Sequence, residues 1–162
     1  MKSILPQNNK TRGLLVLLVG AMVALGFVRD FIFVNLNYQL SFVYYEKERS
    51  FTHSFFDFLN NYSYSQLYYS KWWLTGIFAL LNILLCLVLV YLLFKSKRKV
   101  KVAGLILSGL VVLAFIGYAA GYLTGSTDTA YRFARTIMGA LQSPLPALFL
   151  IPGFLLERKM RE

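Results

Sequence analysis

The stretch WWLTGIFALLNILLCLVLVYLLF, residues 72–94, decides the fold of this chain, because it is long and apolar enough to cross a bilayer. It carries no charged residue, and its single amide side chain is Asn82. A hydrocarbon core about 30 Å thick needs about 20 helical residues, each rising about 1.5 Å. Residues 72–94 therefore predict a transmembrane helix, with an amide that bonds to a neighbouring helix.

Three further apolar stretches of this length lie at Gly13–Val34, Val102–Thr124 and Ile137–Leu156. The chain is 57% hydrophobic, above the roughly 45–50% of soluble domains. Basic residues before Leu14–Val19 give the first stretch some signal-peptide character, but its apolar run to Val34 favours a retained span. We expect residues 1–162 to form one membrane domain. This domain is predicted to be an all-α, antiparallel four-helix bundle with spans near 13–34, 72–94, 102–124 and 132–156 and an outer loop over 35–71.

The net charge of +10 suggests nucleic-acid binding at first, but the placement of the charges argues for a membrane. Eleven of the 17 basic residues fall before the first span, between the second and third, and after the fourth: Lys2, Lys10, Arg12, Lys95, Lys97, Arg98, Lys99, Lys101, Arg158, Lys159 and Arg161. In a four-span chain these places share one side, which the positive-inside rule makes cytoplasmic, with both termini inside. The partner of these charges is then the lipid bilayer and not nucleic acid.

The outer loop is rich in Phe and Tyr, which is unusual for a solvated loop. Phe51, Phe55, Phe58 and Tyr62 recur at helical spacing, so we expect a short helix that lies flat in the interface. Its rings either anchor the loop to lipid or form a surface that docks a partner.

Small residues and prolines predict how the last two spans pack. Gly117, Gly121 and Gly125 are spaced four apart, a sign of close helix contact within the chain or with another subunit. Pro144 and Pro146 each remove a backbone donor, so a kink is expected near Gly139–Ser143. The carbonyls freed there need partners, for which Gln142, Ser143 or water are candidates.

Ionisable groups meet near the outer end of the first and fourth spans. Counted along straight helices, Arg29 and Asp30 lie about 24–26 Å above Gly13, Arg135 about 31 Å above Leu156 and Gln142 about 21 Å above it. Arg132, Arg135 and Gln142 share one helix face. An Asp30–Arg135 pair then fixes the helices, with Arg132 reaching the surface. Alternatively, the surplus of Arg29, Arg132 and Arg135 over one carboxylate holds an anionic group, such as a lipid phosphate, a peptide carboxylate or an acidic side chain of a partner.

Catalytic residues are not evident. His53, the sole histidine, lies in the outer loop, and Cys86, the sole cysteine, lies about 21 Å below the outer boundary, so they cannot form a Cys–His pair. One cysteine excludes an internal disulfide and a multi-thiolate metal site. We expect no enzyme activity, no cofactor and no metal.

Several segments resemble one family of small bacterial membrane proteins. RDFIFVNLNYQL (29–40), SFFDFL (54–59), YSKWWLT (69–75) and ARTIMGALQSPLPALFLIPGF (134–154) are similar to the exosortase-system-associated membrane proteins of the Bacteroidota. The resemblance implies an inner-membrane accessory of an exosortase, a polytopic transpeptidase that processes proteins with a C-terminal sorting signal. It supplies no catalytic residues.

Two functions follow as expectations. The first is a non-enzymatic accessory protein that docks a membrane-protein partner through its outer loop and outer-leaflet arginines. The alternative is a small membrane protein that binds or transports an anionic lipid or metabolite in a pocket at Arg132, Arg135 and Gln142.

Overall fold

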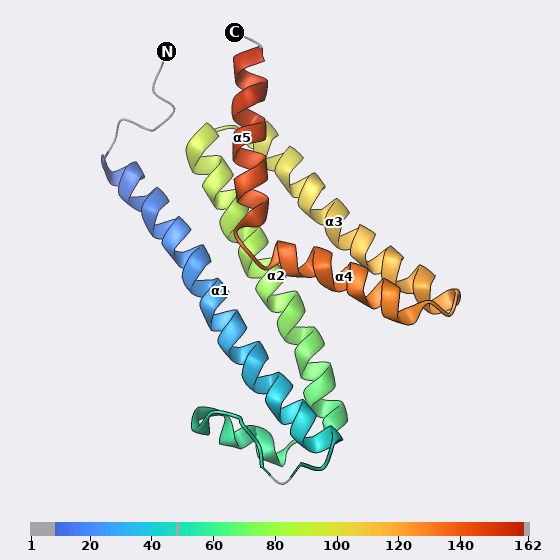
Figure 1. The fold of residues 1–162 in the computed structure, drawn as a ribbon. Coiled ribbons are helices and arrows are strands. Elements are labelled where there is room, and N and C mark those ends of the chain that lie inside the picture. Colours follow the sequence, from blue (N-terminus) through green and yellow to red (C-terminus); the bar gives the residue numbers. More distant parts are fainter. Residues whose placement is uncertain (1–8, 48, 161–162) are drawn as a thin grey trace.

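The computed structural model describes residues 9–47 and 49–160, and every regular element within these ranges is a helix (Figure 1). In chain order the elements are α1 (Asn9–Tyr44), the 3-10 helix η1 (Ser54–Asn61), α2 (Tyr64–Phe94), α3 (Lys97–Leu123), α4 (Thr127–Leu141) and α5 (Leu145–Met160). Three of them, α1, α2 and α3, are long and apolar enough to cross a bilayer. Together α4 and α5 make a fourth candidate span, which is bent by 66°.

Helix α2 is the centre of the packing, because it contacts α1, α3, α4 and α5. Met22, Cys86, Leu107 and Leu141 come from four different helices, and each is 1% exposed in one shared core. Cys86 is therefore a packing residue, as its place in an apolar run predicts. Many other apolar side chains of α1–α3, such as Phe115, face outward, as expected of helices whose solvent is lipid.

The bounds of the first two helices differ from the sequence prediction. Helix α1 runs on to Tyr44 instead of ending near Val34, and α2 begins at Tyr64. The predicted loop over 35–71 therefore shrinks to residues 45–63. The reason is that Leu36 and Leu40 continue the apolar face of α1 and pack on Leu67 of α2.

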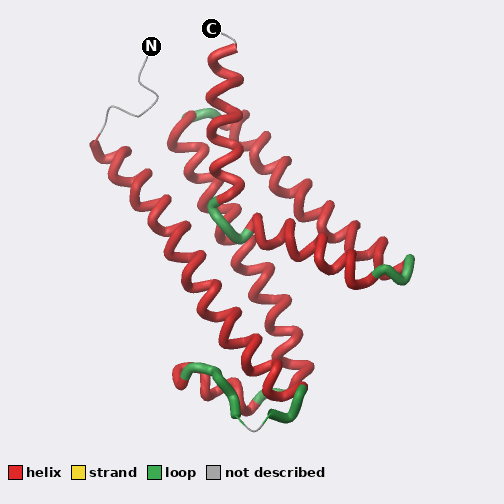
Figure 2. The backbone as a smooth tube through the Cα atoms, viewed as in Figure 1, coloured by secondary structure: helices red, strands yellow, loops and turns green. Residues whose placement is uncertain are grey.

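Two buried amides of α1 hold the shortened loop against the end of the α1–α2 hairpin. Asn35 and Gln39, one helical turn apart, are 4% and 0% exposed. The Asn35 Oδ1 accepts from the His53 backbone N–H at 2.7 Å, and the Gln39 Oε1 accepts from the hydroxyls of Ser50 and Thr52 at 3.0 and 3.2 Å. Figure 2 shows this loop, with its short helix, lying across the hairpin end.

A short helix is present in this loop as the 3-10 helix η1, but it includes neither Phe51 nor Tyr62, and a different ring faces inward. Phe56 is 6% exposed and meets Phe31 of α1 with 5.5 Å between ring centroids. Phe55 and Phe58, on the face that periodicity singled out, point outward. The loop is thus fixed through Phe56 and leaves its other rings uncovered.

Helices α3 and α4 pack closely through two of the three spaced glycines. A methyl group at Gly117 would lie 2.7 Å from the ring of Phe133, and one at Gly121 would overlap the methyl of Ala130. The contact is therefore internal to the chain. Gly125 corrects the prediction: nothing lies within 4 Å of its Cβ position, and its φ of +75° places it in the turn before α4, a conformation that favours glycine.

The break between α4 and α5 falls at residues 142–144, at the edge of the predicted kink. The bend turns α4 sideways from α5 (Figure 1). A count of rise along a straight helix from Leu156 therefore misplaces Arg135.

We expect Gly121→Leu to lower the free energy of unfolding by about 1–3 kcal/mol, because the new side chain overlaps Ala130. The matched control is Gly109→Leu on the same helix, where nothing lies within 4 Å of the Cβ position. Unfolding of the purified protein in mixed micelles with increasing dodecyl sulfate measures both. Equal midpoints for the two variants would contradict the α3–α4 packing.

Candidate functional site

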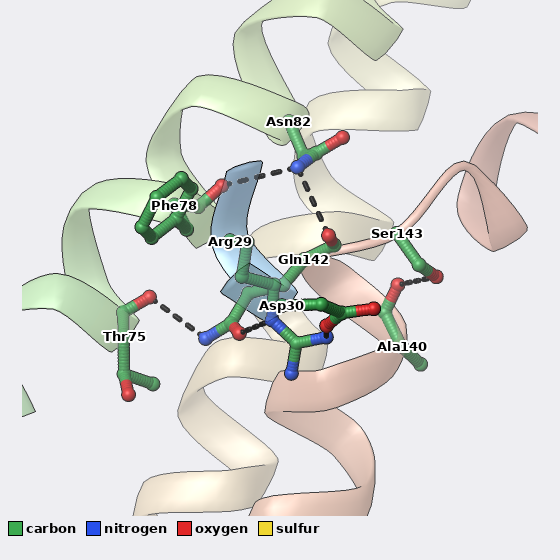
Figure 3. A network of polar contacts seen from close by, with 8 residues as sticks. All are labelled: Arg29, Asp30, Thr75, Phe78, Asn82, Ala140, Gln142 and Ser143. Atoms are coloured by element: carbon green, nitrogen blue, oxygen red, sulfur yellow. Dashed lines mark hydrogen bonds and ion pairs between the residues drawn. The ribbon is translucent and has the colours of Figure 1, made fainter. Parts of the chain in front are cut away.

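The side chain of Gln142, at the C-terminal end of α4, ties three helices together. It is 2% exposed. Its Oε1 accepts from the Arg29 Nε of α1 at 2.6 Å, and its Nε2 donates to the Thr75 carbonyl of α2 at 2.9 Å (Figure 3). The site therefore begins at the point where the fourth apolar stretch breaks.

The same break takes the usual i+4 backbone donor away from two carbonyls. The Ala140 carbonyl still accepts from the Ser143 backbone N–H at 3.1 Å, and both carbonyls accept from a side chain. In a continuous helix the N–H of residue i bonds the carbonyl of residue i−4, so Pro144 and Pro146 take away the donors for Ala140 and Gln142. The Ser143 hydroxyl donates to the Ala140 carbonyl at 2.7 Å, and the Asn82 Nδ2 of α2 donates to the Gln142 carbonyl at 3.0 Å (Figure 3). Asn82 thus bonds a neighbouring helix, and Ser143 serves as a local donor, both as predicted.

A cavity of about 380 Å³ adjoins this junction between α1, α2 and α4. Its lining combines charged, polar and aromatic side chains: Arg29, Asp30, Phe33, Val34 and Asn37 of α1; Tyr68, Lys71, Trp72 and Thr75 of α2; Tyr131, Ala134, Arg135, Met138, Gly139 and Gln142 of α4. Three cationic side chains and one carboxylate therefore face the same space.

The pairing of these charges differs from the predicted pairing. Asp30 accepts from the Nη1 of its neighbour Arg29 at 2.9 Å, and not from Arg135. Lys71 donates to the Asn37 Oδ1 at 2.7 Å. Across residues 9–47 and 49–160, the Arg135 guanidinium has no hydrogen bond or ion pair. The cavity therefore keeps a positive surplus, because its one carboxylate already belongs to Arg29.

Four of the five residues expected in an ionic cluster line this cavity, namely Arg29, Asp30, Arg135 and Gln142. Arg132 and Arg135 are both exposed, but only Arg135 lines the cavity. The helix face turned to the cavity carries Tyr131, Arg135, Met138 and Gln142. Each residue turns the side chain by about 100° around the helix axis, so Arg132, which follows Tyr131, lies on another face.

The α2 wall was not predicted as part of the site. Tyr68, Lys71, Trp72 and Thr75 line the cavity, although the aromatic residues of this segment are typical of a membrane anchor. Their spacing of i, i+3, i+4 and i+7 is the signal that places them on one face.

Neither a metal site nor a known relative indicates which ligand or reaction this site serves. No three His, Cys, Asp or Glu side chains within the described part of the chain lie together as metal ligands would. No protein-family model, curated protein or solved structure matches this chain.

We expect Asn82→Leu to lower the free energy of unfolding by about 1 kcal/mol, because it leaves the Gln142 carbonyl without a donor in a buried place. Thr75→Val is the matched control: it removes a hydroxyl that bonds only the Lys71 carbonyl of its own helix, and it keeps the backbone acceptor for Gln142. The dodecyl sulfate midpoint again measures both. A midpoint for Asn82→Leu equal to that of the native protein would argue against the Asn82 bond.

Proposed function

We propose that this chain is a non-enzymatic, multi-pass membrane protein that binds an anionic group, phosphate or carboxylate, in the cavity between α1, α2 and α4. The observation that carries the proposal is Arg135, a guanidinium that lines the cavity without a counter-ion among the described residues. Lys71 and Arg29 line the same space, so the surplus charge is shared and not isolated.

The geometry of these side chains suits anion binding. Guanidinium groups present parallel donors that match phosphate and carboxylate oxygens. Arg29 is held by Gln142 and Asp30, so its position is set before a ligand arrives. An anion beside Arg135 offsets a positive surplus that is costly inside a membrane.

In this proposal the chain crosses a bacterial inner membrane four times, with both termini in the cytoplasm. Support comes from the arrangement in Figure 1, in which the start of α1, the α2–α3 link and the end of α5 gather at one end. That end carries Lys95, Lys97, Arg98 and Lys101, as the positive-inside rule favours for the cytoplasmic side. The loop with η1 then lies on the periplasmic side.

We expect Arg135→Gln to weaken anion binding about tenfold or more, because it removes a charge-assisted contact worth about 1.5–3 kcal/mol. Arg132→Gln, on the same helix but outside the cavity, is the control and changes binding less than about twofold. Equilibrium binding of radiolabelled inorganic phosphate and of radiolabelled phosphatidylglycerol to the protein in neutral detergent gives both constants. Absence of Arg135-dependent binding for both probes would contradict the proposal.

A second candidate function is docking of a membrane-protein partner, such as an exosortase-type transpeptidase, on the aromatic side chains of the loop between α1 and α2, here called the aromatic loop. The observation that favours it is the exposure of Phe51, Phe55, Phe58 and Tyr62, which are 72%, 72%, 52% and 45% exposed. Exposed apolar groups of this kind mark a contact surface, whereas Phe56 of the same loop packs inward. Arg132, exposed on α4, adds a charged contact for the same partner.

For this second function we expect a photo-crosslinking amino acid at Phe55 to give a protein adduct in native membranes, identified by mass spectrometry as a polytopic transpeptidase. The same amino acid at Phe115, an exposed position in the middle of α3, is the control and gives lipid adducts. Lipid adducts alone at both positions would reduce the aromatic loop to a membrane anchor.

A further inference from the structure

The size of the cavity says something about the ligand. At about 380 Å³ it falls within the range of about 300–1,000 Å³ that accommodates drug-sized molecules. An inorganic anion leaves most of this space unfilled. A ligand that fits therefore carries further atoms besides its anionic group.

The walls indicate what those atoms are. Part of the lining is polar, and its Gln142 side chain bonds both Arg29 and the Thr75 carbonyl. Other lining side chains are apolar or aromatic, and among them Phe33, Met138 and Trp72 come one from each of the three helices. A lining that joins cations to apolar walls matches a molecule with an anionic group and a hydrocarbon part.

The cavity is also bordered by helices that do not close it on one side. Helix α1 packs on α2 and η1, whereas α4 packs on α2, α3 and α5, so α1 and α4 face each other across the cavity. Two lining side chains, Val34 and Trp72, are 47% and 43% exposed, so the chain does not fully enclose the cavity. An open side that faces lipid would give an amphiphile a lateral entry path.

We propose that the ligand of this cavity is an anionic amphiphile of the lipid class. Its anionic headgroup binds Arg135 and Lys71, and its hydrocarbon part lies against Phe33, Trp72 and Met138. This inference rests on the proposed anion binding and adds the hydrocarbon part, which separates a lipid from a free phosphate or a small organic anion.

The two tryptophans of the chain allow a direct test. Trp73 is 76% exposed and does not line the cavity, so Trp73→Phe leaves Trp72 as the sole tryptophan, placed in the cavity wall. Brominated acyl chains quench tryptophan fluorescence on contact. The protein is placed in phosphatidylcholine nanodiscs that contain either brominated phosphatidylglycerol or brominated phosphatidylcholine, each over the same increasing series of mole fractions.

We expect phosphatidylglycerol to quench Trp72 at a mole fraction several times lower than phosphatidylcholine does. Arg135→Gln in the same background makes the two lipids equal, whereas Arg132→Gln preserves the difference. Arg135→Lys, which keeps the positive charge, retains part of the preference and shows that the fold tolerates substitution at this position.

The outcomes separate the two proposals. Equal quenching by both lipids, together with Arg135-dependent binding of inorganic phosphate, would overturn the amphiphile and leave the anion site standing. Equal quenching with no Arg135-dependent binding of phosphate would overturn both. A preference for phosphatidylglycerol that survives Arg135→Gln would also overturn this headgroup position.

Discussion

The hydrogen bond from the Asn82 side chain to the Gln142 carbonyl is what the rest of the site depends on. Pro146 removes the backbone donor for that carbonyl, and a buried carbonyl left without a donor costs about 1 kcal/mol or more. Because α2 supplies the donor, the fourth apolar stretch can break inside the packed helices. The Gln142 side chain then reaches Arg29 of α1 and the Thr75 carbonyl of α2, which joins three helices at one residue.

The break between α4 and α5 determines where the charged side chain of Arg135 lies. A straight fourth helix would carry Arg135 up along the axis of α5, but the 66° bend swings α4 across toward α3. There Gly117 and Gly121 let Phe133 and Ala130 approach closely, which holds α4 in its new direction. One face of α4 is then left opposite α1 and α2, and the cavity with its surplus of cations lies between them.

Features set by local sequence were predictable, and features set by contacts between helices were not. Long apolar runs located α1, α2 and α3, and two closely spaced prolines located the break, because both effects act within one segment. The direction of the bend depends on the glycines of α3 and on Asn82, so the position of Arg135 could not be counted from Leu156. The polar side chains of Asn35 and Gln39 led to the prediction that both residues belong to the loop. In the structure both are buried in α1 and hold the loop by hydrogen bonds. Lys71 was missed because its aromatic neighbours indicated an anchor.

A distance measurement between α1 and α4 in a bilayer tests most directly whether the Asn82–Gln142 junction sets the architecture. In a Cys86→Ala background, nitroxide labels are attached at Tyr38 of α1 and Thr129 of α4, both exposed, and the distance distribution is recorded by pulsed electron paramagnetic resonance in nanodiscs. We expect one narrow distribution for the parent protein and a broad or shifted one after Asn82→Leu. A narrow, unchanged distribution in the Asn82→Leu variant would contradict the dependence of α4 on this junction.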